Sequence, residues 1–292
     1  MKVIESFVDK IDQFKTIGSQ GFLYTSLRYF GEPTDKDLRN ATFVLHLPVE
    51  EGEVNALWNA EKVSEYLQNF ATQNNYEHAV RLQSGMIANA LVSGTTIKVN
   101  QNVAIDELEV KALAHHELGV HLLTTLNARS QPLKLLSLGM PLNTLTQEGL
   151  AILCEYLSGC LSVKRLQKLA LRVVAVNSMI KERSFKRTFS QLKDEYRVSD
   201  ADAFTITTRV YRGGGFTKDY VYLQGFHKML SAYESEKDFD LLLAGKTSLD
   251  YLPSLTRIID KGLLAELERI SPALKMNLDI DPVQKFIAHA IK

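Results

Sequence analysis

Two histidines flank a glutamate in residues 115–121, which read HHELGVH, and a further carboxylate follows at Glu148. Imidazole nitrogens and carboxylate oxygens are ligands that zinc prefers, and catalytic zinc sites use three such ligands and leave a fourth position for water. We therefore predict a Zn²⁺ ion held by His116, His121 and Glu148. Glu117 would lie beside the open position, where it can act as a general base and later protonate the leaving amine.

The two predicted histidine ligands are five residues apart, whereas the usual helical zinc motif separates them by four. At about 100° per residue, an α-helix would point the two rings roughly 140° apart. One i→i+5 turn brings both rings back to one face, and Gly119 makes that distortion easier. The spacing therefore predicts a π-type widening of the helix at residues 118–120.

Glu148 belongs to the run Gln-Glu-Gly-Leu-Ala at residues 147–151, which we expect at the start of a helix. Glu155, two turns further on, would orient one histidine through its second ring nitrogen. His115 is interpreted as a packing or surface histidine. The alternative is an ordinary helix with exposed histidines and a solvated glutamate.

A triple glycine at residues 213–215 lies between Arg212 and Lys218. Glycines let backbone amides approach a ligand, so Gly214 is a candidate substrate contact. A guanidinium or ammonium group binds a terminal carboxylate well. We predict that Arg212 and Lys218 bind the substrate's carboxylate; a plain flexible linker is the alternative.

Three neighbouring side chains extend this hypothesis. Thr217 would cap the helix that follows the glycines. Tyr222 could donate its phenol to the oxyanion of the reaction, although helical tyrosines are usually packed. Arg129 is a further candidate for the anion site, or for a salt bridge in a loop.

Hydrophobic periodicity predicts an α+β fold, with a small mixed sheet followed by a mostly helical half. The expected elements are helices over 1–16 and 53–73, a strand over 42–47, strands over 78–82, 86–92 and 95–99, a turn at Ser93-Gly94, a helix starting at Asp106-Glu107, and helices from Thr144 onward. We expect one catalytic domain over 1–292 with lobes 1–128 and 129–292, which meet near the loop 129–143. An edge hairpin before the motif helix suits peptidases, which bind substrate along such a strand.

Bulk composition narrows the function classes. Lys plus Arg and Asp plus Glu both number 34, so net charge offers no argument for nucleic acid or an anionic membrane as partner. Two cysteines do not make a disulfide framework, and neither a signal peptide nor an apolar run of membrane-spanning length is evident. We expect a cytoplasmic protein.

The motifs together resemble a known group. The segment 115–121, the residues Thr125-Leu126-Asn127 and Gln131-Pro132-Leu133, the QEGLA run and the segment 214–222 are similar to the flavohemoglobin expression-modulating QEGLA motif family. That family resembles the microtubule-associated tyrosine carboxypeptidases, which remove the C-terminal tyrosine of α-tubulin. The resemblance covers roughly residues 40–235.

The resemblance implies a zincin-like zinc metallopeptidase, with His116, His121 and Glu148 at the ligand positions and Glu117 at the catalytic one. The predicted activity is removal of a residue from a peptide or protein C-terminus. Two alternatives stay open: a regulatory peptide-binding protein with a structural zinc, and an endopeptidase or small-molecule amidase on the same metal core.

Overall fold

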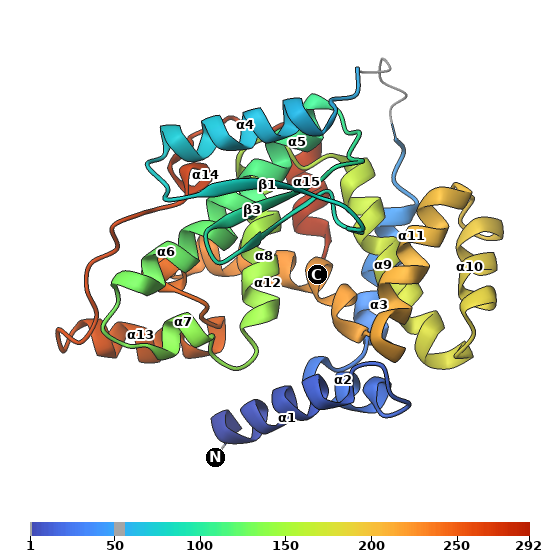
Figure 1. Cartoon of the computed structure of the whole chain (residues 1–292), viewed down its shortest axis with the longest axis horizontal. Helices are drawn as coiled ribbons and strands as arrows, with labels where there is room; N and C mark the ends of the chain where they lie inside the picture. The colour runs from blue at the N-terminus through green and yellow to red at the C-terminus, as the bar shows by residue number, and fades with distance from the viewer. Residues whose placement is uncertain (1, 50–55) are drawn as a thin grey trace. The chain divides into compact units, whose positions relative to one another are not determined.

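The computed structural model describes residues 2–49 and 56–292, and within this part the chain is mostly helical with one three-stranded sheet (Figure 1). This confirms the predicted α+β class. The chain forms two compact units. Unit 1 comprises Met1–Val49, Ser162–His227 and Phe286–Lys292, and unit 2 comprises Glu50–Leu161 and Lys228–Lys285.

Unit 1 is helical and is built around a long helix, α9. Fully buried apolar side chains of α9, among them Leu169, Val173 and Val176, form its core. The elements that lie in unit 1 are α1 (Lys2–Thr16), α2 (Phe22–Phe30), α3 (Asp35–Leu45), α9 (Val163–Glu182), α10 (Phe185–Asp194), α11 (Asp200–Tyr211), the short helices η2 (Arg212–Gly214) and η3 (Thr217–Tyr220), and the first half of α12 (Val221–Ser235).

Helix α3 replaces the strand predicted over 42–47, which was wrong. A capping box starts the helix: the Asp37 amide donates to Thr34 Oγ1 at 3.3 Å, and the Thr34 amide donates to Asp37 Oδ2 at 2.8 Å. Ala41 and Val44 then lie on one buried helical face that packs against α9. The upstream cap and the partner helix outweigh the strand propensity of the apolar run.

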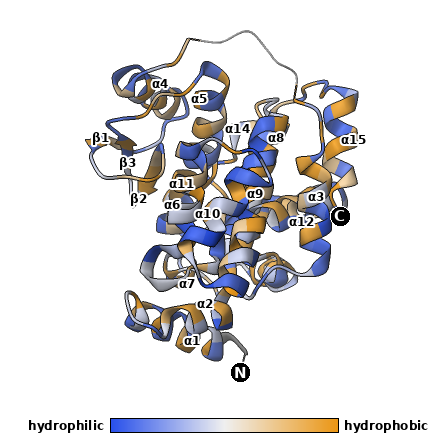
Figure 2. Ribbon diagram, turned by 90° about the vertical axis from the view of Figure 1, so that its right-hand side faces the viewer, coloured by the Kyte–Doolittle hydropathy of each residue, from blue (hydrophilic) through white to orange (hydrophobic). Residues whose placement is uncertain are grey.

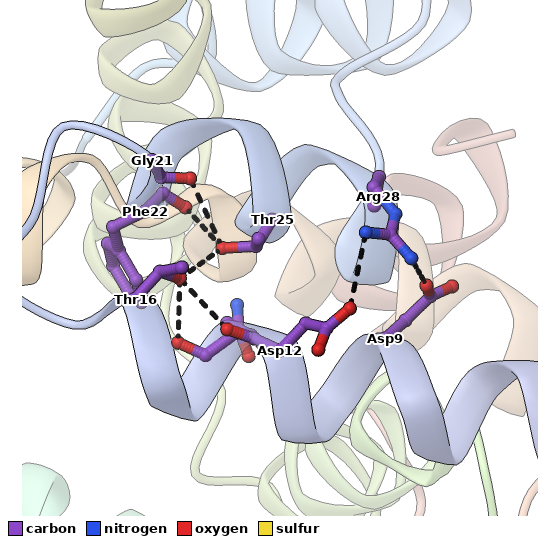
Figure 3. A network of polar contacts seen from close by, with 8 residues as sticks. Asp9, Asp12, Thr16, Gly21, Phe22, Thr25 and Arg28 are labelled. Carbon is purple, nitrogen blue, oxygen red and sulfur yellow. Dashed lines mark hydrogen bonds and ion pairs between the residues drawn. The ribbon is translucent and has the colours of Figure 1, made fainter.

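Helices α1 and α2 form a hairpin, and α1 confirms the helix predicted over 1–16. Arg28 of α2 forms ion pairs with Asp9 and Asp12 of α1 (Figure 3). Hydrophilic and hydrophobic residues alternate along α1 (Figure 2), and Ile4 and Phe14 are exposed. The helix is therefore amphipathic, as its spacing predicted.

Unit 2 carries the sheet and the motif helix. Its elements are α4 (Ala60–Gln73), β1 (Ala79–Gln83), β2 (Ala90–Ser93), β3 (Thr96–Asn100), α5 (Glu107–Leu113), the π-helix η1 (Ala114–Leu122), α6 (Leu123–Ser130), α7 (Leu135–Leu138), α8 (Asn143–Leu157), the second half of α12, η4 (Phe239–Ala244), η5 (Leu249–Tyr251), α13 (Leu252–Ile259) and α14 (Pro272–Lys275); α15 (Pro282–Ala290) spans the boundary to unit 1. The helix expected over 53–73 is confirmed only over Ala60–Gln73, as α4. Residues 56–59 are not helical, because Trp58 forms an isolated β-bridge with Ile105 and Asn59 is the N-cap, and residues 53–55 lie outside the described residues.

The sheet is mixed, with strand order β1-β3-β2. Strand β1 runs parallel to β3, and β2 pairs antiparallel with β3 through a tight turn at Gly94, whose φ is 62°. Ile97 and Val99 of β3 are fully buried, and helices α4 and η1 pack against the sheet. Strand β2 is thus an edge strand close to the motif helix.

Helices α5, η1 and α6 form one continuous rod, because they follow each other without a break. Asp106 begins this rod: its Oδ1 accepts the Glu109 amide at 2.8 Å, as the acidic start predicted. The middle third is a π-helix, in which the Leu123 amide donates to Leu118 O, five residues back. The predicted widening at 118–120 is confirmed and extends over all of Ala114–Leu122.

The predicted boundary between two lobes at residue 128 falls inside unit 2, within α6. The hypothesis of a single catalytic domain stays a prediction. Across residues 2–49 and 56–292, no helix combines the length and the apolar character that crossing a bilayer requires. The cytoplasmic location also stays a prediction.

Replacing the cap of the motif rod tests its contribution to stability. Asp106→Ala should lower the free energy of unfolding by about 1 kcal/mol, because the Glu109 amide loses its acceptor. Urea denaturation measures the change. Asp106→Ser keeps an acceptor and should stay within a few tenths of a kcal/mol of wild type. Equal losses in both variants would contradict the capping role.

Candidate metal centre

Three potential ligands converge at the middle of the π-helix. His116, His121 and Glu148 each present one ligand atom, and these atoms all lie within 4.8 Å of one another. Glu148 Oε2 is 3.6 Å from His116 Nε2 and 3.5 Å from His121 Nε2. His116 and Glu148 are buried, whereas the His121 side chain is 22% exposed. The group is therefore enclosed but reachable from one side.

These distances fit a tetrahedral ion. Zinc binds nitrogen and oxygen at about 2.0–2.2 Å, so tetrahedral ligands stand about 3.3–3.6 Å apart. The distances from Glu148 Oε2 to the two histidine Nε2 atoms, 3.6 and 3.5 Å, fall within this range. The two imidazole rings are 5.1 Å apart between centroids and 75° apart in plane, so their Nε2 atoms can converge without stacking. The three residues can hold a divalent metal ion.

Glu155 orients one of the histidines. Its Oε1 is 2.7 Å from His116 Nδ1, and its side chain is 1% exposed. A carboxylate that accepts the Nδ1 proton fixes the tautomer and leaves Nε2 free for a metal. Because Glu148 and Glu155 lie two turns apart on α8, one helix supplies both a potential ligand and the carboxylate that hydrogen-bonds His116.

The electrostatics of the group favour a cation. Burial lowers the pKa of His116, but its hydrogen bonds to Glu148 and Glu155 outweigh burial and raise the pKa to about 9. The two buried carboxylates thus favour a positive charge at His116. A divalent cation would take over this role, since buried carboxylates require a nearby positive charge.

Glu117 lies beside the group at the edge of the sheet. Its Oε2 accepts the Val92 amide of β2 at 3.1 Å, and the side chain is half-buried. The Val92 amide is therefore directed away from β3, toward the free side of the edge strand. The Glu117 carboxylate thus lies at the free edge of β2.

The QEGLA run lies inside α8 rather than at its start, since the helix begins at Asn143. Gln147, which the sequence alone did not assign, accepts the Thr124 hydroxyl at 3.0 Å and donates to Gly245 O at 3.3 Å. Thr124 also donates to His121 O at 3.3 Å. The glutamine thus ties the ligand helix α8 to the end of the π-helix.

His115 is outside the ligand group, as expected. Its ring packs edge-on against Phe70 at 5.2 Å between centroids, and burial lowers its pKa to about 4. Cys154 and Cys160 are free thiols, which agrees with the absence of a disulfide framework.

The predicted substrate residues around the glycine run lie in unit 1. Arg212 Nη2 is 3.4 Å from Asp219 Oδ1, and its guanidinium stacks over Phe216 at 4.5 Å. Asp219 is fully buried, and its closer partner is Arg209, whose Nε donates at 2.5 Å. Burial raises the pKa of Asp219, but Arg209, Arg172 and Arg212 outweigh it and hold the pKa at about 2. The ionised Asp219 carboxylate thus attracts Arg209, Arg172 and Arg212.

The glycines have a packing role that the sequence did not reveal. Gly213, Gly214 and Gly215 have φ values of 68°, 110° and 118°, which only glycine adopts readily. A Cβ at Gly214 would come within 2.9 Å of Ser19 O. The predicted helix cap at Thr217 was wrong: its hydroxyl donates to Ser26 O at 3.2 Å, and the N-cap position of η3 is Phe216.

The remaining candidates occupy distinct surroundings. Tyr222 is buried, with Arg172 over its ring at 5.1 Å and Lys218 Nζ 3.4 Å from its hydroxyl. Arg129 lies on α6 and pairs with Glu77 at 3.2 Å, which is the salt bridge considered as its alternative. Roles in substrate binding or catalysis for Tyr222, Arg129 and Gly214 stay predictions.

Two histidines from one helix and a glutamate from the next, with another glutamate at a sheet edge, form an arrangement typical of metal-dependent hydrolases. The chain belongs to a carboxypeptidase family. The model of the microtubule-associated tyrosine carboxypeptidase family matches residues 1–292, which confirms the relationship inferred from the motifs. None of the curated proteins compared with the chain matches it.

Two solved structures are similar to this chain at low identity, and the first of them shares its fold. A candidate lipoprotein of Colwellia psychrerythraea is 16% identical with a TM-score of 0.52, and the match covers 90% of this chain and 52% of that protein. A candidate lipoprotein of unknown function from Shewanella oneidensis is 15% identical with a TM-score of 0.46, over 86% and 56%. The chain spans about half the length of these proteins.

Glu155→Gln tests the orienting hydrogen bond. The amide keeps the shape but loses the charge that favours a protonated Nδ1 on His116, so affinity for a divalent metal should fall about 10–100-fold. Competition with a metal-binding dye measures the dissociation constant. Glu65→Gln, at an exposed position of α4, is the matched control and should bind as wild type. Equal affinities of both variants would argue against the role of Glu155.

Proposed function

We propose that the chain is a zinc-dependent carboxypeptidase. The observation that supports this most is the convergence of His116, His121 and Glu148 at ligand distances, with Glu117 next to them at the edge strand. Membership of a carboxypeptidase family agrees with it. Zinc is preferred because two imidazoles and one carboxylate are a common catalytic zinc ligand set.

A zinc ion bound by these three residues would lower the pKa of a water molecule and polarise the scissile carbonyl. Glu117 accepts a proton from the attacking water and returns it to the departing amine, which splits one proton transfer into two short steps. The Val92 amide fixes the position of Glu117 Oε2 and leaves its other oxygen for this exchange. Glu155 keeps His116 in the tautomer that binds the metal.

The substrate in this proposal is an extended peptide that pairs with the free side of β2. Strand β2 has β3 on one side only, so the outer backbone groups that remain beside the Val92 amide, which donates to Glu117, can pair with a further strand. The family is described by its action on tyrosine, and a C-terminal tyrosine is therefore the first side chain to test.

We further propose that Arg212 and Lys218 bind the terminal carboxylate. Both are basic residues beside the glycine run, and Asp219 limits the orientation of Arg212. Tyr222 holds Lys218 through its hydroxyl, which restricts the ammonium to a small volume. Pre-orientation of this kind increases affinity, because less side-chain entropy is lost on binding.

Structural zinc sites are usually closed by four protein ligands, whereas catalytic sites keep one position open. In the described residues, the group at η1 and α8 contains three such ligands. This favours catalysis over the alternative of a regulatory protein with a structural zinc.

Glu117→Gln tests the general base. Peptidase activity should fall roughly 10²- to 10⁴-fold, because the amide cannot take the proton of the attacking water. The metal content, measured by atomic absorption, should remain that of wild type, since Glu117 is not one of the three ligands. Full activity in a metal-loaded Glu117→Gln protein would rule out this base, and Glu65→Gln serves as control.

Lys218→Ala tests carboxylate recognition. Wild type should cleave peptides with a free C-terminal carboxylate far better than the same peptides amidated. In the variant this preference, measured as a ratio of kcat/KM values, should drop by about tenfold or more, because a charge-assisted hydrogen bond is lost. Lys186→Ala, an exposed site in α10, should keep the ratio. An unchanged ratio in Lys218→Ala would refute this assignment.

A further inference from the structure

Asn127 and Gln131, two polar residues that follow the 115–121 motif in sequence, hold a C-terminal segment of unit 2 in place. Gln131 forms a reciprocal pair with Ala265: its amide nitrogen donates to Ala265 O at 3.1 Å, and its oxygen accepts the Ala265 amide at 2.9 Å. Asn127 Nδ2 donates to Leu243 O at 2.9 Å and to Arg269 O at 2.8 Å. Asn127 and Gln131 are both buried. We call residues 265–271 the back segment.

The back segment ends at Ser271, which is fully buried. Ser271 occupies the N-cap position of α14, where serine normally accepts a backbone amide, yet its side chain makes no capping hydrogen bond. Its Oγ instead lies 3.4 Å from Cys154 Sγ of α8. The side chain is thus directed at the ligand helix rather than at its own helix.

The same oxygen also lies next to the π-helix. A Cβ added at Gly119 would come within 3.2 Å of Ser271 Oγ, closer than ordinary van der Waals contact. Gly119 does not have a positive φ, so its backbone would accept another residue. Space, rather than conformational freedom, is therefore what requires glycine at this position.

Ser271 Oγ thus contacts α8 and lies beside the π-helix, the two elements that carry the metal group. Gly119 lies between the two histidine ligands in sequence, and Cys154 precedes Glu155 directly. Helix α14 packs against both η1 and α8. The burial of Cys154 raises the pKa of its thiol to about 12, so the Ser271–Cys154 contact joins two neutral groups.

We propose that Ser271 is a positioning residue that sets the separation between the π-helix and α8, and thereby holds His116, His121 and Glu148 at metal-binding distances. Asn127 and Gln131 fix the back segment so that Ser271 stays at this place. The inference rests on the proposed metal function. Asn127 and Gln131, which take no part in the catalytic steps, thereby have a structural role at the metal group.

A size exchange between Gly119 and Ser271 tests the proposal. Gly119→Ala adds the methyl group that meets Ser271 Oγ, and Ser271→Ala removes that oxygen. The zinc dissociation constant of each variant is measured by competition with a chromophoric chelator, and urea denaturation of the metal-free proteins is recorded in parallel. Gly21→Ala is the matched control, because its nearest neighbour lies at 3.6 Å and its φ is −78°.

We expect Gly119→Ala to bind zinc at least about tenfold more weakly than wild type. In the Ser271→Ala background, the same substitution should weaken zinc binding by about threefold or less relative to Ser271→Ala alone. Gly21→Ala should bind as wild type. A Gly119→Ala protein that is less stable without metal but has the wild-type zinc affinity would overturn the positioning role. Equal losses with and without Ser271→Ala would overturn it as well.

If Gly119→Ala does not fold, the double variant decides. A Gly119→Ala/Ser271→Ala double variant that folds and binds zinc with nearly wild-type affinity supports the proposal. A double variant that also fails to fold overturns it. A wild-type protein without zinc affinity is a separate outcome, since it would refute the proposed function itself. In that case Ser271 has no metal group to position, and the inference is overturned with it.

Discussion

The interval of five residues between His116 and His121 constrains the motif helix and the elements around it. Two imidazoles can meet one ion only if both project from the same side, and the chain meets this condition by widening the helix over Ala114–Leu122. A π-helix is uncommon because it packs less well around its own axis. Here Leu118, Val120 and Leu122 are fully buried, and each buried side chain of this size contributes about 1.5–3 kcal/mol. Tertiary packing thus offsets the unfavourable backbone.

Charge is the second constraint at this place. Glu117, Glu148 and Glu155 lie around two histidines, and two of the three carboxylates are buried. Such a group is stable only with compensating positive charge, because desolvated carboxylates are costly. Protons and a metal ion compete for the same imidazole, so acid should weaken metal binding. The tight contact of Glu155 with His116 biases this competition, since it places the proton on the nitrogen that faces away from the metal.

The candidate site was largely predictable because its information is local. Ligand type, the five-residue interval and the cap at Asp106 lie within a short stretch, and Glu148 and Glu155 follow from helical spacing. Strand–helix ambiguity caused the error at residues 42–47, where an apolar run is compatible with both structures. Elements that depend on distant partners were not predictable.

Ser271 shows why contacts between distant elements could not be predicted from the sequence. A Ser-Pro pair indicates a helix start, but the Ser271 side chain instead contacts Cys154, more than 100 residues away in sequence. Gln147 and Asp219 also have partners in other elements, although these partners are closer in sequence: Gln147 donates to Gly245 O, and Asp219 accepts from Arg209 of α11. Asn127 and Gln131 stood out in sequence, yet only the position of the back segment explains them.

The interleaving of the two units affects how the protein is made. Helix α3 is synthesised early, but its packing partner α9 begins more than 100 residues later, and Asn40 hydrogen-bonds the backbone of Lys292. Unit 2 is likewise interrupted by residues 162–227. The apolar face of α3 therefore stays exposed until α9 has been synthesised, and unit 1 is complete only when Phe286–Lys292 have followed. Expression yield should depend on chaperones that shield this early segment, and one cut within residues 50–285 would leave both units incomplete on either fragment.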